Sequence, residues 1–355
     1  MKYSLLFLLQ FIILGLITTA QTNNKILFDN DWTFHLGGAQ GAEQNSFDDA
    51  SWRKIDLPHD WSIEDLKGTN SPFNRDAITQ ANGGFTTGGT GWYRKAFKFS
   101  PQDKNKKVQI QFDGVYMNAD VWINGHALGN HPYGYTGFMY DLTEFIKFDG
   151  INIIAVEVKN EGLNSRWYSG SGIYRHVWLS MLEPIHFLPW TTFISTASVN
   201  KNAATINIKS SIINESIADA HLRVVTKIYD DATKEIVATE TTEPIIAKKT
   251  IEINQHFNIK MPRLWSCESP VLYSVETIIY EGEKILASEK NYTGIRSISF
   301  DVSKGFQLNG ETVKLKGGCF HNDNGLLGAR AYDRAEERKV SLLKASGYNA
   351  IRCSH

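Results

Sequence analysis

Two polar segments near the end of the chain carry the residue types best suited to chemistry. One is the loop 321–325, which follows an apolar run over residues 313–320, and the other follows the apolar pair 350–351. Imidazole, guanidinium and carboxylate groups can hydrogen-bond the hydroxyls of a sugar, and imidazole and carboxylate can also ligate a metal ion. The candidate substrate-binding side chains are therefore His321, Asp323, Arg352 and His355.

The types of these side chains alone are compatible with three different roles. They can line the sugar-binding wall of a hydrolase, or His321 and Arg352 can tie loops together, or His321, Asp323 and His355 can form a metal site. The first use is favoured, because polar residues at the carboxyl ends of barrel strands point into the active site. No further ligands accompany the third set, so the sequence identifies neither a metal site nor a cofactor.

The elements that must position these segments read as a strand, a helix and a second strand. Residues 313–320 suit a buried strand, and residues 350–351 begin another. Between them, Asp333 stands three residues before Glu336, as in a capping box at a helix start, and Gly347 is placed as the helix stop. Two strands joined by a helix in this spacing make one parallel βαβ unit.

One such unit cannot form a domain by itself. Parallel strands need cover on both faces, and a (β/α)8 barrel takes ~250 residues. Residues 297–355 are far fewer. We therefore expect them to be the incomplete start of a TIM-barrel catalytic domain, in a chain that is truncated relative to the whole enzyme.

Residues 21–185 show the pattern of an antiparallel β-sandwich of the jelly-roll type. Val108, Ile110 and Phe112 alternate with polar residues, as in a strand with one buried face, and Asn124-Gly125 is a strong tight-turn signal. Residues 151–156 are apolar in both phases, which predicts a central strand. Many short strands without helices are typical of a sandwich or jelly roll.

Residues 186–296 show a second set of strands without helices. Ile206, Ile208 and Ile212 share one face of a strand, and a later strand over residues 273–279 is followed by a Glu-Gly turn. About seven short strands in ~110 residues fit an immunoglobulin-like β-sandwich. The Cys–Trp–Cys core of antibody domains is missing, so the chain is mainly β with two sandwiches before the βαβ unit.

Residues 1–20 have the pattern of a signal peptide. Lys2 precedes an apolar stretch over residues 5–17, and small residues allow cleavage after Ala20. We expect a periplasmic or secreted protein with no membrane segment after cleavage. The net charge of -1 and the lack of a basic run argue against a nucleic-acid partner. Three cysteines are too few for a disulfide framework, and Cys319 and Cys353 are expected to pack as small apolar neighbours.

Two further segments invite a functional interpretation. The segment 166–175 alternates aromatic, small and arginine residues, so it is either a loop that reaches a sugar site or a tight structural corner, and the corner is favoured. The glycine-rich segment 82–91 is followed by no helix and is therefore a loop rather than a phosphate site. Trp61 and Trp122 are expected in the core, where large rings contribute most to packing.

Six ordered motifs, spread over ~320 residues, together resemble glycoside hydrolase family 2 of the β-galactosidase type, in its N-terminal portion. One motif alone would be unspecific, whereas six in this order are specific. They are Trp52 to Trp61 with Leu57-Pro58-His59-Asp60-Trp61, Gly91-Trp92-Tyr93-Arg94, Phe112-Asp113-Gly114-Val115 with Val121-Trp122-Ile123-Asn124-Gly125, Gly170-Ser171-Gly172-Ile173-Tyr174-Arg175, Lys316-Gly317-Gly318-Cys319-Phe320-His321, and Asn349-Ala350-Ile351-Arg352-Cys353-Ser354-His355.

The resemblance implies a jelly-roll sugar-binding domain, an immunoglobulin-like domain and a (β/α)8 catalytic barrel, in that order. It also implies a retaining mechanism with two glutamates, ~5–5.5 Å apart, as acid/base and nucleophile. In the family both lie downstream of this stretch, so no catalytic residue is assigned here. His321, Arg352 and His355 match positions that line the sugar subsite next to the scissile bond, whereas Asn322 stands where many relatives have a second histidine.

The function implied by the resemblance is hydrolysis of terminal β-galactosides in an oligo- or polysaccharide. A sister activity on β-glucuronides or β-mannosides is the nearest alternative. A non-catalytic carbohydrate-binding protein made of the two sandwiches is an alternative from another class. With both glutamates expected downstream, the 355-residue chain alone should be inactive. The sequence does not specify an oligomeric state.

Overall fold

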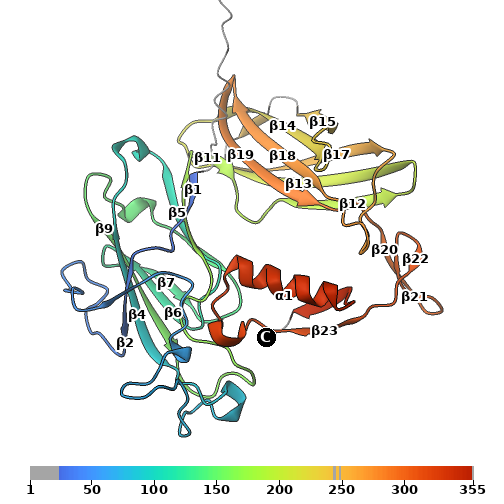
Figure 1. Ribbon diagram of the computed structural model, residues 1–355. Helices are drawn as coiled ribbons and strands as arrows, with labels where there is room; N and C mark the ends of the chain where they lie inside the picture. The colour runs from blue at the N-terminus through green and yellow to red at the C-terminus, as the bar shows by residue number, and fades with distance from the viewer. Residues whose placement is uncertain (1–23, 243–244, 248, 354–355) are drawn as a thin grey trace, which may run out of the picture.

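The computed structural model describes residues 24–242, 245–247 and 249–353. It contains two β-sandwiches and a single α-helix within the described residues, and the helix lies in the angle between the sandwiches (Figure 1). The expected signal peptide over residues 1–20 and the candidate His355 lie outside the described residues. No helix in the described part of the chain is long and apolar enough to cross a membrane.

The first sandwich is built from a four-stranded and a six-stranded antiparallel sheet. The four-stranded sheet runs in the order β1 (Asn24–Leu27), β10 (Val177–Leu182), β5 (Lys107–Phe112) and β8 (Phe138–Asp141). The six-stranded sheet runs in the order β3 (Arg53–Ile55), β2 (Trp32–Leu36), β4 (Gly89–Phe97), β9 (Asn152–Asn160), β6 (Ala119–Ile123) and β7 (His126–His131).

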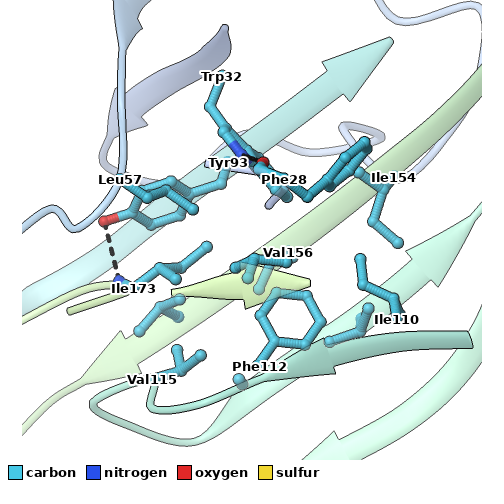
Figure 2. Close-up of a cluster of buried hydrophobic side chains, with 14 of the residues drawn as sticks. Phe28, Trp32, Leu57, Tyr93, Ile110, Phe112, Val115, Ile154, Val156 and Ile173 are labelled. Atoms are coloured by element: carbon cyan, nitrogen blue, oxygen red, sulfur yellow. Dashed lines mark hydrogen bonds between the residues drawn. The ribbon is translucent and has the colours of Figure 1, made fainter. Parts of the chain in front are cut away.

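The core of this sandwich forms because alternate residues of each strand face the opposite sheet. In β5, Val108, Ile110 and Phe112 are fully buried while the residues between them are half-buried. Figure 2 shows Ile110 and Phe112 facing Val156 of β9 in the other sheet. The predicted two-sheet architecture is confirmed, and β9 is a central strand as its two-sided apolar pattern indicated.

The second sandwich is likewise formed by two antiparallel sheets. One contains β11 (Ile185–Phe187), β13 (Ala203–Asn214), β12 (Phe193–Val199) and β17 (Thr250–Lys260). The other contains β15 (Ile236–Thr241), β16 (Ile245–Ala247), β14 (Ala220–Asp230), β18 (Tyr273–Glu281) and β19 (Lys284–Thr293). Ile206, Ile208 and Ile212 are buried on one face of β13, as their spacing predicted.

A small antiparallel sheet and a parallel pair of strands follow the second sandwich. The small sheet consists of β20 (Ile298–Asp301), β21 (Gly305–Leu308) and β22 (Glu311–Thr312). The parallel pair is β23 (Gly317–Phe320) and β24 (Ala350–Cys353), joined by α1 (Asp333–Ala345). The βαβ unit is therefore present, whereas the start of a barrel stays a prediction.

Three local predictions for this unit have different outcomes. Gly347, at φ +85°, does end α1, and the N–H of Tyr348 bonds the carbonyl of Leu343 at 3.1 Å, as in a Schellman motif. The capping box was wrong, because Tyr332 occupies the N-cap and Asp333 already lies inside the helix. The buried strand over 313–320 was also wrong: only the last four residues form β23, and most of that run is exposed.

Replacing one core residue of β5 tests the alternation that forms the first sandwich. Ile110→Ala should lower the free energy of unfolding by about 2–5 kcal/mol, because it leaves a cavity between the two sheets. Gln109→Ala, on the opposite face of the same strand, should change it by less than about 0.5 kcal/mol. Urea denaturation followed by tryptophan fluorescence measures both variants, and equal effects would contradict the assignment of the buried face.

Candidate functional site

The two faces of the parallel pair carry different side chains. Cys319 is paired in register with Arg352, whose guanidinium donates to the Cys319 sulfur at 3.9 Å, so these two lie on one face. Phe320 and Cys353 are on the other face, where the ammonium group of Lys339 in α1 lies 4.4 Å from the Phe320 ring centre. The helix therefore covers one face, and Arg352 is exposed on the face that points away from it.

The two late cysteines lie on adjacent strands but on opposite faces of the pair, and neither packs in a core. Cys319 and Cys353 are both free and exposed in the described structure. The expectation that they act as buried apolar residues was therefore wrong. The physical reason is that two strands and one helix offer too few neighbouring residues to cover both faces of the strand pair.

His321 lies against a loop of the first sandwich. Its ring centre is 4.8 Å from that of Trp167, at an interplanar angle of 57°. Trp167 belongs to the loop between β9 and β10 and is 41% exposed. The amide of Asn322 also donates to the carbonyl of Ser169 in this loop, at 3.2 Å. The loop after β23 is therefore fixed to the first sandwich by both an aromatic contact and a hydrogen bond.

The structure gives less information on the other two candidates, Asp323 and His355. Asp323 is exposed, and its backbone carbonyl accepts a hydrogen bond from Lys339 at 3.1 Å. His355 lies outside the described residues. Across the described ranges, no group of three or more His, Cys, Asp or Glu residues could hold a metal ion, so the metal hypothesis gains no support there. The structure thus sets His321 and Arg352 on neighbouring strand ends and leaves the roles of all four candidates as predictions.

A buried carboxylate, which sequence reasoning left unassigned, joins this region to the first sandwich. Asp60 is 1% exposed, and one of its oxygens accepts from the N–H of Ser62 at 3.0 Å, the hydroxyl of Ser62 at 2.6 Å and the N–H of Ser171 at 2.9 Å. Its other oxygen accepts from the hydroxyl of Tyr168 and from the N–H of Ala329 at 2.8 Å. Three separate segments therefore converge on one side chain.

The packing around Asp60 admits only glycine at two positions. Gly328 has a φ of +62°, and a Cβ there would lie 2.5 Å from a carboxylate oxygen of Asp60. A Cβ on Gly170, at φ +70°, would lie 2.3 Å from that of Ala329. Burial and the neighbouring Asp60 raise the pKa of Tyr168, so its hydroxyl stays protonated as a donor to Asp60. The close approach of these backbones explains the glycines in both segments.

The start of α1 is held to the first sandwich by a histidine between two carboxylates. His176, just before β10, bonds Asp29 through Nδ1 at 2.6 Å and Asp333 of α1 through Nε2 at 3.3 Å. Burial lowers the pKa of His176, but the hydrogen bonds and charges of Asp29 and Asp333 outweigh it and raise the pKa above its ordinary value. Both ring nitrogens of His176 therefore have a carboxylate partner, and the side chain links the two parts of the chain.

The segment 166–175 forms the structural corner that was favoured for it, and its use as a loop that reaches a sugar site stays a prediction. Ser171 and Ile173 are buried at the corner of the sandwich, which is the structural use. Its ends reach outward, since Trp167 meets His321 and Arg175 lines a cavity of ≈ 250 Å³. The other lining residues of this cavity are Phe320, His321, Asn322, Ala331, Glu336 and Cys353.

The carboxylate of Glu336 in this cavity bonds two neighbouring side chains. It accepts from the amide of Asn324 at 2.7 Å and pairs with Lys339 at 2.9 Å. It lies on α1, hence on the covered side of the strands.

Comparison with known proteins agrees with this architecture. The model described as "Glycosyl hydrolases family 2, sugar binding domain" matches residues 27–183, and the model described as "Glycosyl hydrolases family 2" matches residues 188–296. These ranges cover the two sandwiches. The chain therefore belongs to glycosyl hydrolases family 2 and corresponds to the N-terminal portion of its members.

The relatives are glycosidases of two kinds. The chain is 43% identical over 329 residues to a protein named "Beta-galactosidase BoGH2A" of Bacteroides ovatus, covering 92% of this chain and 38% of that protein. It is 39% identical to a "Putative beta-glucuronidase" of Formosa agariphila, covering 92% and 30%. A solved family 2 structure from Bacteroides cellulosilyticus superimposes with a TM-score of 0.90 at 47% identity, covering 93% and 43%. The chain thus spans less than half the length of these proteins.

Removing the Asp60 carboxylate should loosen the contact between the first sandwich and residues 325–332. Asp60→Ala leaves several buried donors without an acceptor, and we expect a loss of about 3 kcal/mol or more in the free energy of unfolding. Hydrogen exchange at Ala329 should accelerate. Asp65→Ala, an exposed acid five positions away, is the control and should change neither. Unchanged exchange at Ala329 in Asp60→Ala would contradict the proposed link.

Removing one of the carboxylates around His176 should change its titration. We expect its pKa to fall in Asp333→Asn, as followed by NMR of the imidazole protons. Because the folded-state pKa is raised, the stability contributed by the contact is full below about pH 6.5 and is lost as the pH rises through the folded pKa. Glu337→Gln removes another exposed acid of α1 and should leave the titration unchanged. An unchanged His176 titration in Asp333→Asn would contradict the contact.

Proposed function

We propose that this chain is the N-terminal part of an exported, retaining β-galactosidase that removes terminal β-galactosyl units from an oligo- or polysaccharide. The observation that carries the proposal is the placement of His321 and Arg352 at the ends of two neighbouring parallel strands, with Trp167 of the first sandwich against His321. Family membership and the 43% identity to a protein named β-galactosidase support it. Export is proposed on the pattern of residues 1–20.

The proposed role of these side chains is to hold the sugar while charge develops on it. A guanidinium and an imidazole can donate hydrogen bonds to ring hydroxyls, and bonds that strengthen in the oxocarbenium-like transition state lower the barrier. The two glutamates that perform the chemistry in the family are proposed to lie beyond this chain. Within it, the first sandwich holds the loop of His321 through Asp60.

A β-glucuronidase is the second candidate, because a relative at 39% identity carries that description. The two substrates differ at one carbon, where a glucuronide bears a carboxylate and a galactoside bears a hydroxymethyl group. The exposed Arg352 could pair with such a carboxylate. Direct comparison of the two substrates decides between the candidates.

The test uses the full-length protein that contains this chain, with aryl β-galactoside and aryl β-glucuronide as substrates. We expect turnover of the galactoside, and a loss of about 10²-fold in kcat/KM in His321→Ala and in Arg352→Ala. Arg334→Ala, which removes an 87% exposed guanidinium on α1, is the matched control and should leave kcat/KM unchanged. The 355-residue chain alone should turn over neither substrate.

Other outcomes would contradict parts of this proposal. Turnover of the glucuronide alone would transfer the assignment to the second candidate. Full activity in both His321→Ala and Arg352→Ala would remove these residues from the sugar subsite. Turnover by the 355-residue chain would show that the catalytic carboxylates lie inside it.

A further inference from the structure

A second cavity in the first sandwich adjoins the candidate site and has no role in the proposal above. It has a volume of ≈ 400 Å³ and is formed by the loop between β9 and β10 together with the segments around residues 82, 116 and 135. Its lining includes Asn82, Tyr116, Tyr135, Asn164, Arg166 and Trp167.

The wall of this cavity is aromatic and held in place. The ring centres of Tyr116 and Tyr135 are 5.1 Å apart at 62°, and those of Tyr133 and Tyr135 are 5.7 Å apart. Tyr116 is only 2% exposed, and its hydroxyl donates to the amide oxygen of Asn164 at 3.2 Å. Asn164 donates in turn to Asn160 at 2.9 Å. The cavity is therefore pre-formed and would not need to be ordered when a ligand binds.

The polar groups at the rim suit a neutral, hydroxyl-rich ligand. Asn82 supplies an amide that can donate and accept, and Arg166 supplies N–H donors, both from exposed positions. Burial raises the pKa of Tyr135, so its hydroxyl stays protonated, and this hydroxyl already has side-chain partners in Ser165 and Tyr116. Aromatic faces beside amide and guanidinium groups match the apolar C–H faces and the hydroxyls of a sugar ring.

The position of the cavity ties it to the candidate site. Trp167 lines the cavity and also contacts the ring of His321 at 4.8 Å, so one indole separates the two places. A sugar chain whose terminal unit lies at His321 can continue over Trp167 into the cavity. In an enzyme that removes a terminal unit, such a path would put the cavity on the leaving-group side of the substrate.

We propose that this cavity binds a further sugar unit on the leaving-group side of the substrate, which makes the substrate class an oligosaccharide rather than a simple galactoside. The inference rests on the proposed function, because it takes His321 as part of the site of cleavage. The half-buried Tyr135 and the exposed Trp167 supply the aromatic wall, and the buried Tyr116 packs against Tyr135. Asn82 and Arg166 bond the hydroxyls. Trp167 is shared between the two places.

The experiment compares chain lengths in the full-length protein. Wild-type kcat/KM should be higher for a β-galactosyl-terminated tetrasaccharide than for an aryl β-galactoside. Asn82→Ala/Arg166→Ala should lower kcat/KM for the tetrasaccharide about tenfold and leave the aryl substrate unchanged. The matched control, Asn202→Ala/Arg338→Ala, removes the same two residue types at exposed positions away from the cavity and should change neither rate.

Binding is measured separately from turnover, by saturation-transfer NMR with a thio-linked tetrasaccharide that resists hydrolysis. Binding that weakens in Asn82→Ala/Arg166→Ala, with aryl turnover intact, supports the cavity as a sugar site. Unweakened binding in that variant, or equal loss on both substrates, overturns it and leaves the glycosidase proposal standing. Binding that depends on the cavity in a protein that hydrolyses no glycoside overturns the proposed function instead.

Discussion

The carboxylate of Asp60 is the interaction on which the arrangement of the candidate site depends. A carboxylate that is 1% exposed must be surrounded by donors, because leaving it without them costs far more than an ordinary hydrogen bond returns. The donors come from the corner of the first sandwich and, through Ala329, from the segment that follows β23. The requirement to satisfy one buried charge therefore fixes a late loop to an early domain.

This link explains how the first sandwich can hold the loop that carries a candidate residue. With residues 325–332 held at Asp60, the preceding His321 is brought to Trp167, and the following α1 is held at His176. The contacts at Asp60 and at His176 therefore restrict the movement of this loop. The sandwich thus both positions the polar loop and supplies an aromatic wall beside it, which is an arrangement that neither part could make alone.

The strands could be predicted from the sequence because burial on one face imposes a period of two, as Ile110 and Phe112 show. The role of Asp60 could not be predicted, because its partner Ala329 is 269 positions away and no local pattern indicates the pairing. The Asp333–Glu336 spacing misled because acids also favour the first turn of a helix, where they face its positive end, and Glu336 bonds Asn324 instead. The candidate residues at the strand ends could be predicted from the local pattern. The contact of Trp167 with His321 could not, because the two residues are far apart in the sequence.

The most direct test of the account is a crystal structure of the full-length protein with a fluorinated β-galactoside trapped as the covalent intermediate. The account predicts that the trapped sugar lies within hydrogen-bond distance of His321 and Arg352, with the loop of Trp167 at its open side and the Asp60–Ala329 bond intact. A sugar trapped elsewhere, in contact with neither His321 nor Arg352, would contradict it.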